Sequence, residues 1–506
     1  MEIKNFEPRT YQLSIVKTCK EKNTLVCLPT GTGKTKIGIL LSIERLNSYE
    51  KSQVLVLTPT KPLAAQICKE FKDNTTIDED RIILLTGSII PEKRMKFYND
   101  ATVIVATPQT INEDLINNRC TLSEYSLLMV DECHRSKENY ANTKVSKFYS
   151  EQSKFPRILA LTASPSSSKD SIDLICKNLS IESIEIRTEN DEDLKEFIQK
   201  KDVEKIFVDF PEDFKAIHDL IKQEYKLRLE GVKSFGIHKP ISVINKTDLL
   251  MLQKRLQGEI RNGNKSAFYG ISLVSQLLKL DYCLNLLETQ TPNAMHNFLT
   301  GLKNDESKAA KSILASENVK EAIELSYKLI DKKTKHPKLN KLLEILKKEM
   351  KINSNYKSIV FANFRNTVVE IVDELNKSGI SAIKFVGQAD RQDKGLKQKE
   401  QIEIIENFKN GKFNVLVASS VGEEGLDIPE VNSVIFYESI GSELRKIQRS
   451  GRTGRTKPGK IIFLMTNDTR DIGYHYSSLK KEQKMKNLLN KMKNEKTILD
   501  YAEDNN

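Results

Sequence analysis

The stretch that most constrains the fold is Leu28-Pro29-Thr30-Gly31-Thr32-Gly33-Lys34-Thr35. A short apolar run at residues 24–28 leads into it, and apolar residues at helical spacing follow it, at Ile37, Leu40, Leu41 and Leu46. A strand therefore feeds a glycine turn that opens a helix. The backbone N–H groups of such a turn, together with the partial positive charge of the helix N-terminus, bind phosphate.

This loop also assigns roles to side chains. We expect Lys34 to reach the outer phosphates of a nucleotide and the Thr35 hydroxyl to ligate Mg²⁺. The strict pattern requires glycine where Leu28 stands, so the match is partial, and a glycine-rich turn without a ligand is the alternative. The nucleotide-binding residues expected here are Leu28, Pro29, Thr30, Gly31, Thr32, Gly33, Lys34 and Thr35.

Length and composition narrow the class of protein. A chain of 506 residues is too long for one hydrophobic core, so about two to four domains are expected. Hydrophobic residues make up 39% and charged residues 29%, which excludes a disordered chain. The net charge of +11 favours a polyanionic partner such as nucleic acid, although a lysine-rich coding bias would give the same figure.

The cysteines and the apolar stretches bear on the compartment. The seven cysteines are scattered without a C-x-x-C pair, which argues against disulfides and a zinc site and implies a reducing environment. No apolar stretch approaches the roughly 18 residues of a membrane span. Residues 1–10 contain the charged side chains Glu2, Lys4, Glu7 and Arg9 and not the apolar core of a signal peptide. We expect a cytoplasmic protein with no membrane contact.

Apolar runs of strand length alternate with helical patterns from residue 53 to residue 161. Such runs predict strands covered on both faces of a mostly parallel α/β sheet, whose ligands bind beyond the carboxyl ends of the strands. Asp131 and Glu132 follow one run and are expected to hold Mg²⁺ and to activate the attacking water, respectively. Two adjacent acids are often a solvated turn, but with Lys34 they predict nucleotide hydrolysis. Residues expected to couple this site to its neighbours are His134, Thr162 and Ser164.

Polar residues outside the phosphate loop and the acidic pair are candidates for binding nucleic acid and the adenine base. Thr60 and Thr107 place hydroxyls and helix-opening N–H groups at strand ends, where they suit nucleic-acid phosphates; plain helix capping is the alternative. Near the start of the chain, Arg9 and Gln12 precede the phosphate loop. The Gln12 amide matches the hydrogen-bonding edge of adenine, with an exposed helix start as the alternative.

The second half of the chain repeats the α/β pattern without a phosphate loop of its own. Instead it carries arginines spaced by small residues at 448–455, which suit a γ-phosphate site formed on another lobe, or else a basic loop for nucleic acid. The catalytic residues expected there are Gln448, Arg452 and Arg455. Upstream, Ser419 can bond a phosphate, Gly425 allows close backbone approach, and Asp427 can accept from a ribose hydroxyl.

These motifs divide the chain. Helical periodicity without a convincing buried strand fills the region between the two α/β patterns. We expect an ATP-binding domain at 1–205, a helical insertion at 206–335, a second α/β domain at 336–480 and a basic helical tail at 481–506.

In order and residue type, the motifs resemble those of superfamily 2 helicases, from Gln12 through Gly31 to Thr35 and Asp131 to His134, and on to Gln448 through Arg455. The segments at 385–388, 395–401 and 421–427 are similar to the archaeal Hef and eukaryotic FANCM/Mph1 branch. The resemblance implies two RecA-like parallel-sheet lobes around a helical insertion. It also implies ATP and Mg²⁺ as cofactors, and nucleic-acid contacts at Thr60, Thr107, Arg365 and Ser419.

The activity implied is that of an ATP-dependent 3′-to-5′ DNA helicase or translocase on forked or branched DNA, in the repair of stalled replication forks. Cys133 replaces the alanine usual in that branch and gives the D-E-C-H form of RIG-I-like RNA sensors, so a duplex-RNA-dependent ATPase is the first alternative. A nucleotide-gated scaffold that does not unwind nucleic acid is another. Ser419 stands where the family has threonine. Because the sequence ends at Asn506, we expect a nuclease, if there is one, on a separate polypeptide, and a nuclease or a sliding clamp as protein partner.

Overall fold

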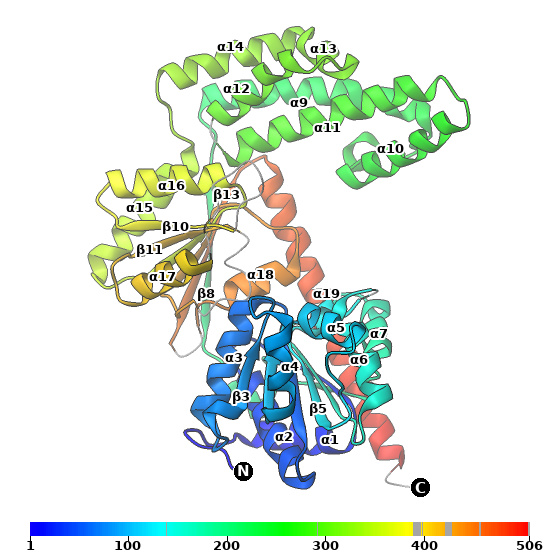
Figure 1. The fold of residues 1–506 in the computed structure, drawn as a ribbon. Helices are drawn as coiled ribbons and strands as arrows, with labels where there is room; N and C mark the ends of the chain where they lie inside the picture. The colour runs from blue at the N-terminus through cyan, green and yellow to red at the C-terminus, as the bar shows by residue number, and fades with distance from the viewer. Residues whose placement is uncertain are drawn as a thin grey trace.

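The computed structural model describes residues 1–137, 139–290, 292–387, 396, 398–419, 428–454 and 457–503. They form two parallel-sheet lobes and a helical bundle (Figure 1). The first lobe lies at the bottom of the view, the second lobe above it, and the bundle at the top. The α/β class expected from the apolar runs is confirmed.

The first lobe contains a seven-stranded sheet in which every neighbouring pair is parallel. In spatial order the strands are β3 (Ile82–Leu85), β4 (Val103–Ala106), β2 (Gln53–Leu57), β5 (Tyr125–Val130), β6 (Ile158–Thr162), β1 (Thr24–Cys27) and β7 (Ser183–Ile186). The helices are α1 (Thr10–Glu21), α2 (Lys34–Ser48), α3 (Lys61–Asn74), α4 (Pro91–Asp100), α5 (Pro108–Ile116), α6 (Ala141–Gln152), α7 (Lys169–Asn178) and α8 (Glu192–Lys195).

Helices cover both faces of this sheet. Val54 and Val56 of β2 pack in one core cluster with residues of α1, α2 and α3. Leu55 and Leu57 pack in another with residues of α5, α6 and α7. Successive strand residues point to opposite faces, so a strand buried on both sides is apolar at every position. This explains the continuous apolar runs in the sequence.

The second lobe contains a six-stranded parallel sheet. Its strands, in spatial order, are β10 (Ala382–Phe385), β11 (Val415–Ala418), β9 (Ser358–Phe361), β12 (Ser433–Phe436), β13 (Gly459–Thr466) and β8 (Lys201–Val208). The helices are α15 (Pro337–Ile352), α16 (Arg365–Lys377), α17 (Gln398–Lys409) and α18 (Glu443–Ser450). The boundary expected at residue 205 falls inside β8, which pairs with β13 along its whole length and so belongs to the second lobe.

The insertion, which follows β8 in the chain and lies on the side of the second lobe away from the first (Figure 1), is a helical bundle with two apolar clusters. Its helices are α9 (Glu212–Val232), α10 (Lys246–Arg261), α11 (Ala267–Thr289), α12 (Pro292–Gly301), α13 (Lys308–Leu314) and α14 (Glu317–Asp331). Short 3-10 helices lie at Glu79–Arg81, Cys133–Arg135, Lys233–Phe235, Ile241–Val243 and Leu302–Asn304.

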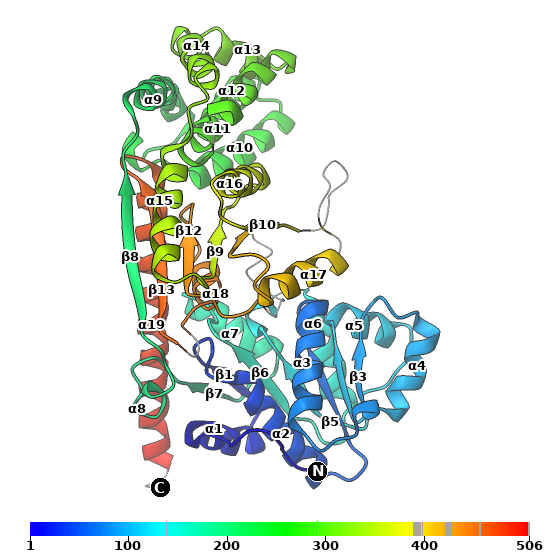
Figure 2. The ribbon, with the colours of Figure 1, turned by 90° about the vertical axis from the view of Figure 1, so that its left-hand side faces the viewer.

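The last helix, α19 (Arg470–Glu503), starts in the second lobe and runs down beside the first (Figure 2). Met485 and Leu489 are buried in a core cluster of the first lobe. The segment expected as a basic tail therefore continues an upstream helix and is packed against the first lobe at these two residues.

The structure describes the cysteines and the lengths of the helices within the ranges given above. No disulfide joins the seven cysteines, all of which lie in those ranges. No helix there reaches the length and apolarity of a membrane span.

Candidate nucleotide site between the lobes

The phosphate loop connects β1 to α2. Gly31 and Gly33 have φ values of 82° and 78°, in the left-handed region that favours glycine. A Cβ on Gly33 would also lie 2.8 Å from the Gln12 side-chain nitrogen. Leu28, where the strict pattern has glycine, is fully buried in the core and its N–H donates to the Thr162 carbonyl at 3.2 Å. Leucine at this position therefore extends the strand packing.

Internal hydrogen bonds shape this loop. Thr32 Oγ1 donates to the Pro29 carbonyl at 2.7 Å, and the Tyr11 hydroxyl donates to the Thr32 carbonyl. Lys34 Nζ donates to the carbonyls of Leu28 and Pro29, at 3.2 and 3.3 Å. The ammonium group thus lies over the loop whose N–H groups would hold phosphate.

The acidic box follows β5. Glu132 has a φ of 49°, an uncommon conformation for a residue with a side chain and one that concentrates at functional sites. His134 Nδ1 lies 3.2 Å from Glu132 Oε2 and 3.3 Å from Thr162 Oγ1, at the end of β6. The Ser164 N–H donates to the same Thr162 oxygen at 3.2 Å. The structure therefore places Glu132, expected to activate water, next to the residues expected to couple the site to its neighbours: His134, Thr162 and Ser164.

The two carboxyl groups of the box differ in acidity. Burial, and then the neighbouring Glu132 charge, raise the pKa of Asp131 to about 7. Burial opposes ionisation of Glu132 as well, but the hydrogen bond from His134, with the charges of His134, Lys34 and Arg135, lowers its pKa. The lowered pKa favours the ionised form of Glu132, as the activation of water requires, whereas burial disfavours the charge on Asp131.

A magnesium ion fits the donor set here. Thr35, the second residue of α2, carries a hydroxyl, and Asp131, directly after β5, carries a carboxyl group whose pKa is raised by burial and by the Glu132 charge. Within the described part of the chain, no cluster of three or more His, Cys, Asp or Glu residues could hold a metal. Mg²⁺ takes one or two protein oxygens and completes its shell with phosphate oxygens and water, which fits the oxygens of Thr35 and Asp131.

The second lobe meets the phosphate loop through the end of α18. A Cβ on Gly451 would lie 2.8 Å from Thr30 Oγ1, so the two chain segments are in close approach. Gln448 and Arg452 lie on and just after this helix. Arg449, between them, is fully buried in the second lobe, donates to Asn363 Oδ1 at 3.2 Å and stacks over Phe361. Arg455, Gly425 and Asp427 lie outside the described residues.

The N-terminal pair also contacts the loop. Gln12 Oε1 accepts from the Arg9 N–H at 3.0 Å, and its Nε2 donates to the Gly33 carbonyl at 3.4 Å. The Arg9 guanidinium stacks over Phe197 at 4.0 Å and donates to the Tyr11 hydroxyl at 3.2 Å. Tyr11 and Phe197 support this site and escaped the sequence reasoning, since apolar neighbours far apart in the chain leave no local signal.

The residues expected to bind nucleic acid all follow strands. Thr60 and Thr107 come after the neighbouring strands β2 and β4, and Arg365 and Ser419 after the neighbouring strands β9 and β11. Thr60 caps α3, accepting from the Leu63 N–H at 3.4 Å, and Thr107 Oγ1 lies 2.9 Å from Thr110 Oγ1. Each lobe thus presents two such residues at the carboxyl edge of its sheet.

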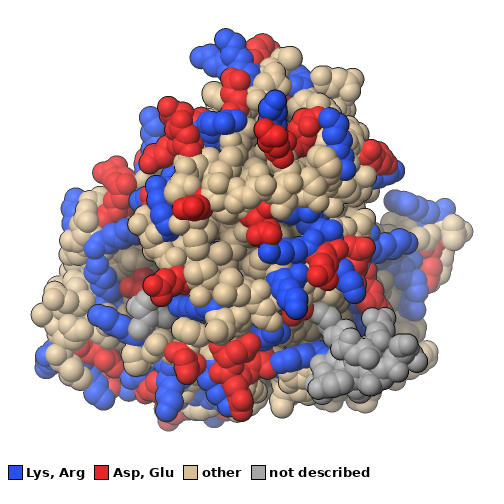
Figure 3. Space-filling model, turned by 90° about the horizontal axis from the view of Figure 1, so that it is seen from below, with Lys and Arg blue, Asp and Glu red and all other residues tan. Residues whose placement is uncertain are grey.

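One face of the molecule shows how its charged side chains are distributed. On the lower face, Lys and Arg side chains alternate with Asp and Glu, so that face is mixed (Figure 3). The net charge of +11 is therefore not displayed there as one basic surface.

Models of three families match successive parts of the chain. The DEAD/DEAH box helicase model matches residues 9–172, the helical bundle of ATP-dependent RNA helicases matches 213–336, and the helicase conserved C-terminal domain matches 337–457. The matches follow the first lobe, the bundle and the second lobe.

Relatives match over nearly the whole chain. A Methanocaldococcus jannaschii protein named as an ATP-dependent RNA helicase is 41% identical over 489 residues, which are 97% of this chain and 61% of that protein. The Neurospora crassa ATP-dependent DNA helicase mph1 is 35% identical over 475 residues, 90% of this chain and 41% of that protein. The crystal structure of the Pyrococcus furiosus Hef helicase domain has a TM-score of 0.74 and 40% identity, covering 93% of this chain and 98% of that one.

Two parallel-sheet lobes, with a phosphate loop and acidic box on one and an arginine-bearing segment of the other in close approach to that loop, define the class of ATP-hydrolysing helicases. The chain belongs to superfamily 2 of these enzymes, in the branch of the Hef, Mph1 and FANCM helicases. It spans about 61% of the Methanocaldococcus protein and 41% of the Neurospora protein.

Proposed function

We propose that this chain is an ATP-driven motor that translocates 3′ to 5′ on DNA and acts on forked or branched DNA, in the repair of stalled replication forks. The observation that carries the proposal is the approach of Gly451 to Thr30, because it joins the arginine-bearing segment of one lobe to the phosphate loop of the other. Supporting it, relatives of this chain are named as ATP-dependent DNA helicases. We also propose that the protein is cytoplasmic.

In this proposal ATP lies between the lobes. Lys34 and the loop N–H groups hold the phosphates, and the Gln12 amide hydrogen-bonds to adenine. Thr35 and Asp131 would hold Mg²⁺, which would neutralise phosphate charge when bound. Glu132 orients the attacking water and gains a proton from it. From the second lobe, Gln448, Arg452 and Arg455 stabilise the charge that develops on the transferred phosphoryl group, while Gly425 and Asp427 approach the ribose.

Hydrolysis is coupled to movement through the two halves of the site. ATP draws the lobes together and its products let them part, a hinge motion of the kind common in such enzymes. His134 and Thr162 connect Glu132 to the end of β6, and Ser164 continues that connection. Thr60 and Thr107 on one lobe, with Arg365 and Ser419 on the other, grip the phosphate backbone alternately.

The test is the ATP hydrolysis rate with a panel of single-stranded, duplex, forked and four-way DNA and duplex RNA. We expect the highest stimulation with forked or four-way DNA, and strand separation on substrates with a 3′ single-stranded loading tail. Stimulation that falls steeply with salt is expected as well, since phosphate contacts dominate nucleic-acid affinity. Equal rates with every DNA would contradict branch specificity.

A duplex-RNA-dependent ATPase is the second candidate function. Cys133 gives the box the D-E-C-H form, and the Methanocaldococcus relative is named as an RNA helicase. Stimulation by duplex RNA well above that by forked DNA would favour this candidate. A separate nuclease or a sliding clamp is the protein partner that we propose for either activity.

A further inference from the structure

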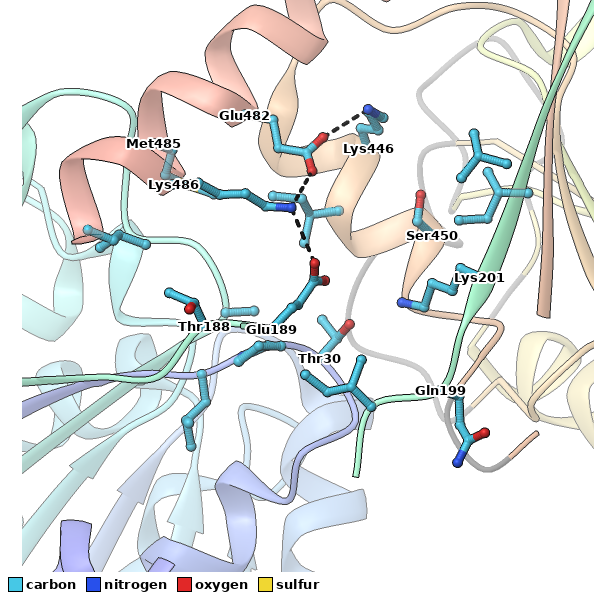
Figure 4. Close-up of a pocket in the computed structure, with 18 of the residues that line it drawn as sticks. Thr30, Thr188, Glu189, Gln199, Lys201, Lys446, Ser450, Glu482, Met485 and Lys486 are labelled. Atoms are coloured by element: carbon cyan, nitrogen blue, oxygen red, sulfur yellow. Dashed lines mark hydrogen bonds and ion pairs between the residues drawn. The ribbon is translucent and has the colours of Figure 1, made fainter. Parts of the chain in front are cut away.

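Four charged residues connect the two lobes beside the phosphate loop (Figure 4). Lys446 of α18 donates to Glu482 of α19 at 2.8 Å, and Lys486 of α19 lies 3.2 Å from the other Glu482 oxygen. Lys486 also donates to Glu189, which follows β7 in the first lobe, at 3.3 Å. We call Lys446, Glu482, Lys486 and Glu189 the charge chain.

Apolar packing supports the charge chain. Met485 and Leu489, on the same part of α19, are buried in a core cluster of the first lobe, and Ile447 of α18 packs against that cluster. Lys493, one turn further along, forms an ion pair with Asp191. These contacts therefore attach α19 to the first lobe beside the candidate nucleotide site.

The charge chain lines a cavity of about 470 Å³ between the lobes. Thr30 of the phosphate loop and Ser450, at the end of α18, also line this cavity from the two lobes, and Figure 4 labels both. The end of α18 approaches the phosphate loop where Gly451 lies beside Thr30, and the cavity lies next to that contact. The charge chain lines the same cavity, so it lies where the approach of α18 to the loop is determined.

We propose that Glu482 is a positioning residue that fixes α18, and with it Gln448 and Arg452, at working distance from the phosphate loop. The inference rests on the proposed function of the nucleotide site. Lys446 is two positions before Gln448 on α18, so a shift of Lys446 moves the functional residues with it. The side chains of Lys446 and Glu482 are 11% and 20% exposed, so solvent and salt screen this pair less than a surface pair.

The first experiment replaces Glu482 by Gln, which keeps the size of the side chain and removes its charge. We expect the kcat of nucleic-acid-stimulated ATP hydrolysis to fall about three- to tenfold, with KM for ATP within about twofold of wild type, since the phosphate loop is unchanged. Glu482→Asp retains the charge and is expected to recover at least half of the loss. The control is Glu44→Gln, which breaks the surface pair of Lys20 and Glu44 (2.7 Å) and leaves both values unchanged.

The second experiment cuts the charge chain at its far end. Glu189 is 53% exposed, so Glu189→Gln cuts the charge chain without changing a buried residue. Because solvent screens its pair with Lys486, we expect kcat to fall in the same direction as in Glu482→Gln but by a smaller factor, about twofold. The single variants Glu189→Gln and Lys446→Met are compared with the double variant. If the residues act as a unit, the loss of kcat in the double variant is no greater than the larger of the two single losses. Wild-type kcat in Glu189→Gln and Glu482→Gln, additive losses, or a parallel rise in KM would each overturn the inference.

Lys34→Ala separates this inference from the function on which it rests. Loss of hydrolysis in Lys34→Ala together with wild-type kcat in the variants of the charge chain refutes the positioning role alone. Retained hydrolysis in Lys34→Ala refutes the proposed nucleotide site itself.

Discussion

His134 Nδ1 lies 3.2 Å from Glu132 Oε2, so the residue proposed to activate water is held by a neighbour that also reaches Thr162. Because His134 lowers the pKa of Glu132, its removal should raise that pKa. We expect His134→Ala to lower kcat by about tenfold or more and to move the acid limb of the pH–rate profile to higher pH. His134→Asn, which keeps a donor near the Nδ1 position, should restore most of the activity. An acid limb unchanged in His134→Ala would contradict the coupling.

The approach of Gly451 to Thr30 predicts a steric effect. A Cβ at Gly451 would meet three Thr30 atoms at 2.8 to 3.2 Å, so Gly451→Ala must push the lobes apart. Overpacking of this kind costs about 1–3 kcal/mol, and we expect kcat to fall about tenfold. Thr30→Gly removes those atoms and should restore activity to Gly451→Ala, relative to Thr30→Gly alone. Steady-state hydrolysis in the four combinations tests this; equal losses from Gly451→Ala in both backgrounds would count against it.

Stability should depend on pH through His336. This residue is buried beside Phe210, Phe214 and Tyr437, and burial, followed by the charge of Lys338, lowers its pKa from 6.5 to about 3. The unfolded chain then binds more protons below pH 6.5, so stability is lost as the pH falls from 6.5 toward 3. At pH 5 the loss from this group is about 2 kcal/mol.

The matched variant for that prediction is His336→Asn. The His336 side chain caps α15 by accepting the Lys338 N–H at 3.2 Å, and asparagine supplies an acceptor at the same place without a titrating ring. Denaturant unfolding at pH 7 and pH 5 should show a smaller loss of stability in His336→Asn. The same loss in both proteins would show that His336 does not titrate as its burial implies.

Much of the fold could be predicted because the signals are local. The phosphate loop, Asp131 and the apolar runs of β2 and β5 depend on neighbouring residues and on burial on both faces. By contrast, β8 is an edge strand with Val203 and Phe207 exposed, and its partner β13 lies in the second half of the chain. Nothing in the sequence around β8 specifies that pairing.

The missed parts of the site have similar causes. Glu482 and Lys486 belong to a lysine-rich segment that looks like a solvated tail, and the buried Met485 and Leu489, four residues apart, are a weak sign of packing. Arg449 belongs to the same arginine-rich segment as Arg452 but is buried against Phe361. Residue type alone does not distinguish Arg449, which supports its own lobe, from Arg452, which we propose acts on the transferred phosphoryl group.

The central claim is that one nucleotide site is completed across two lobes, and Arg452→Ala tests it most directly. Equilibrium ATP affinity and steady-state kcat would be measured on the same preparation, and on Arg455→Ala beside it. Arginines in this role are worth about 10³ to 10⁵ in rate, so we predict a kcat at least about 100-fold lower with ATP affinity within about threefold of wild type. A kcat close to wild type, or a loss explained entirely by weaker ATP binding, would contradict the account.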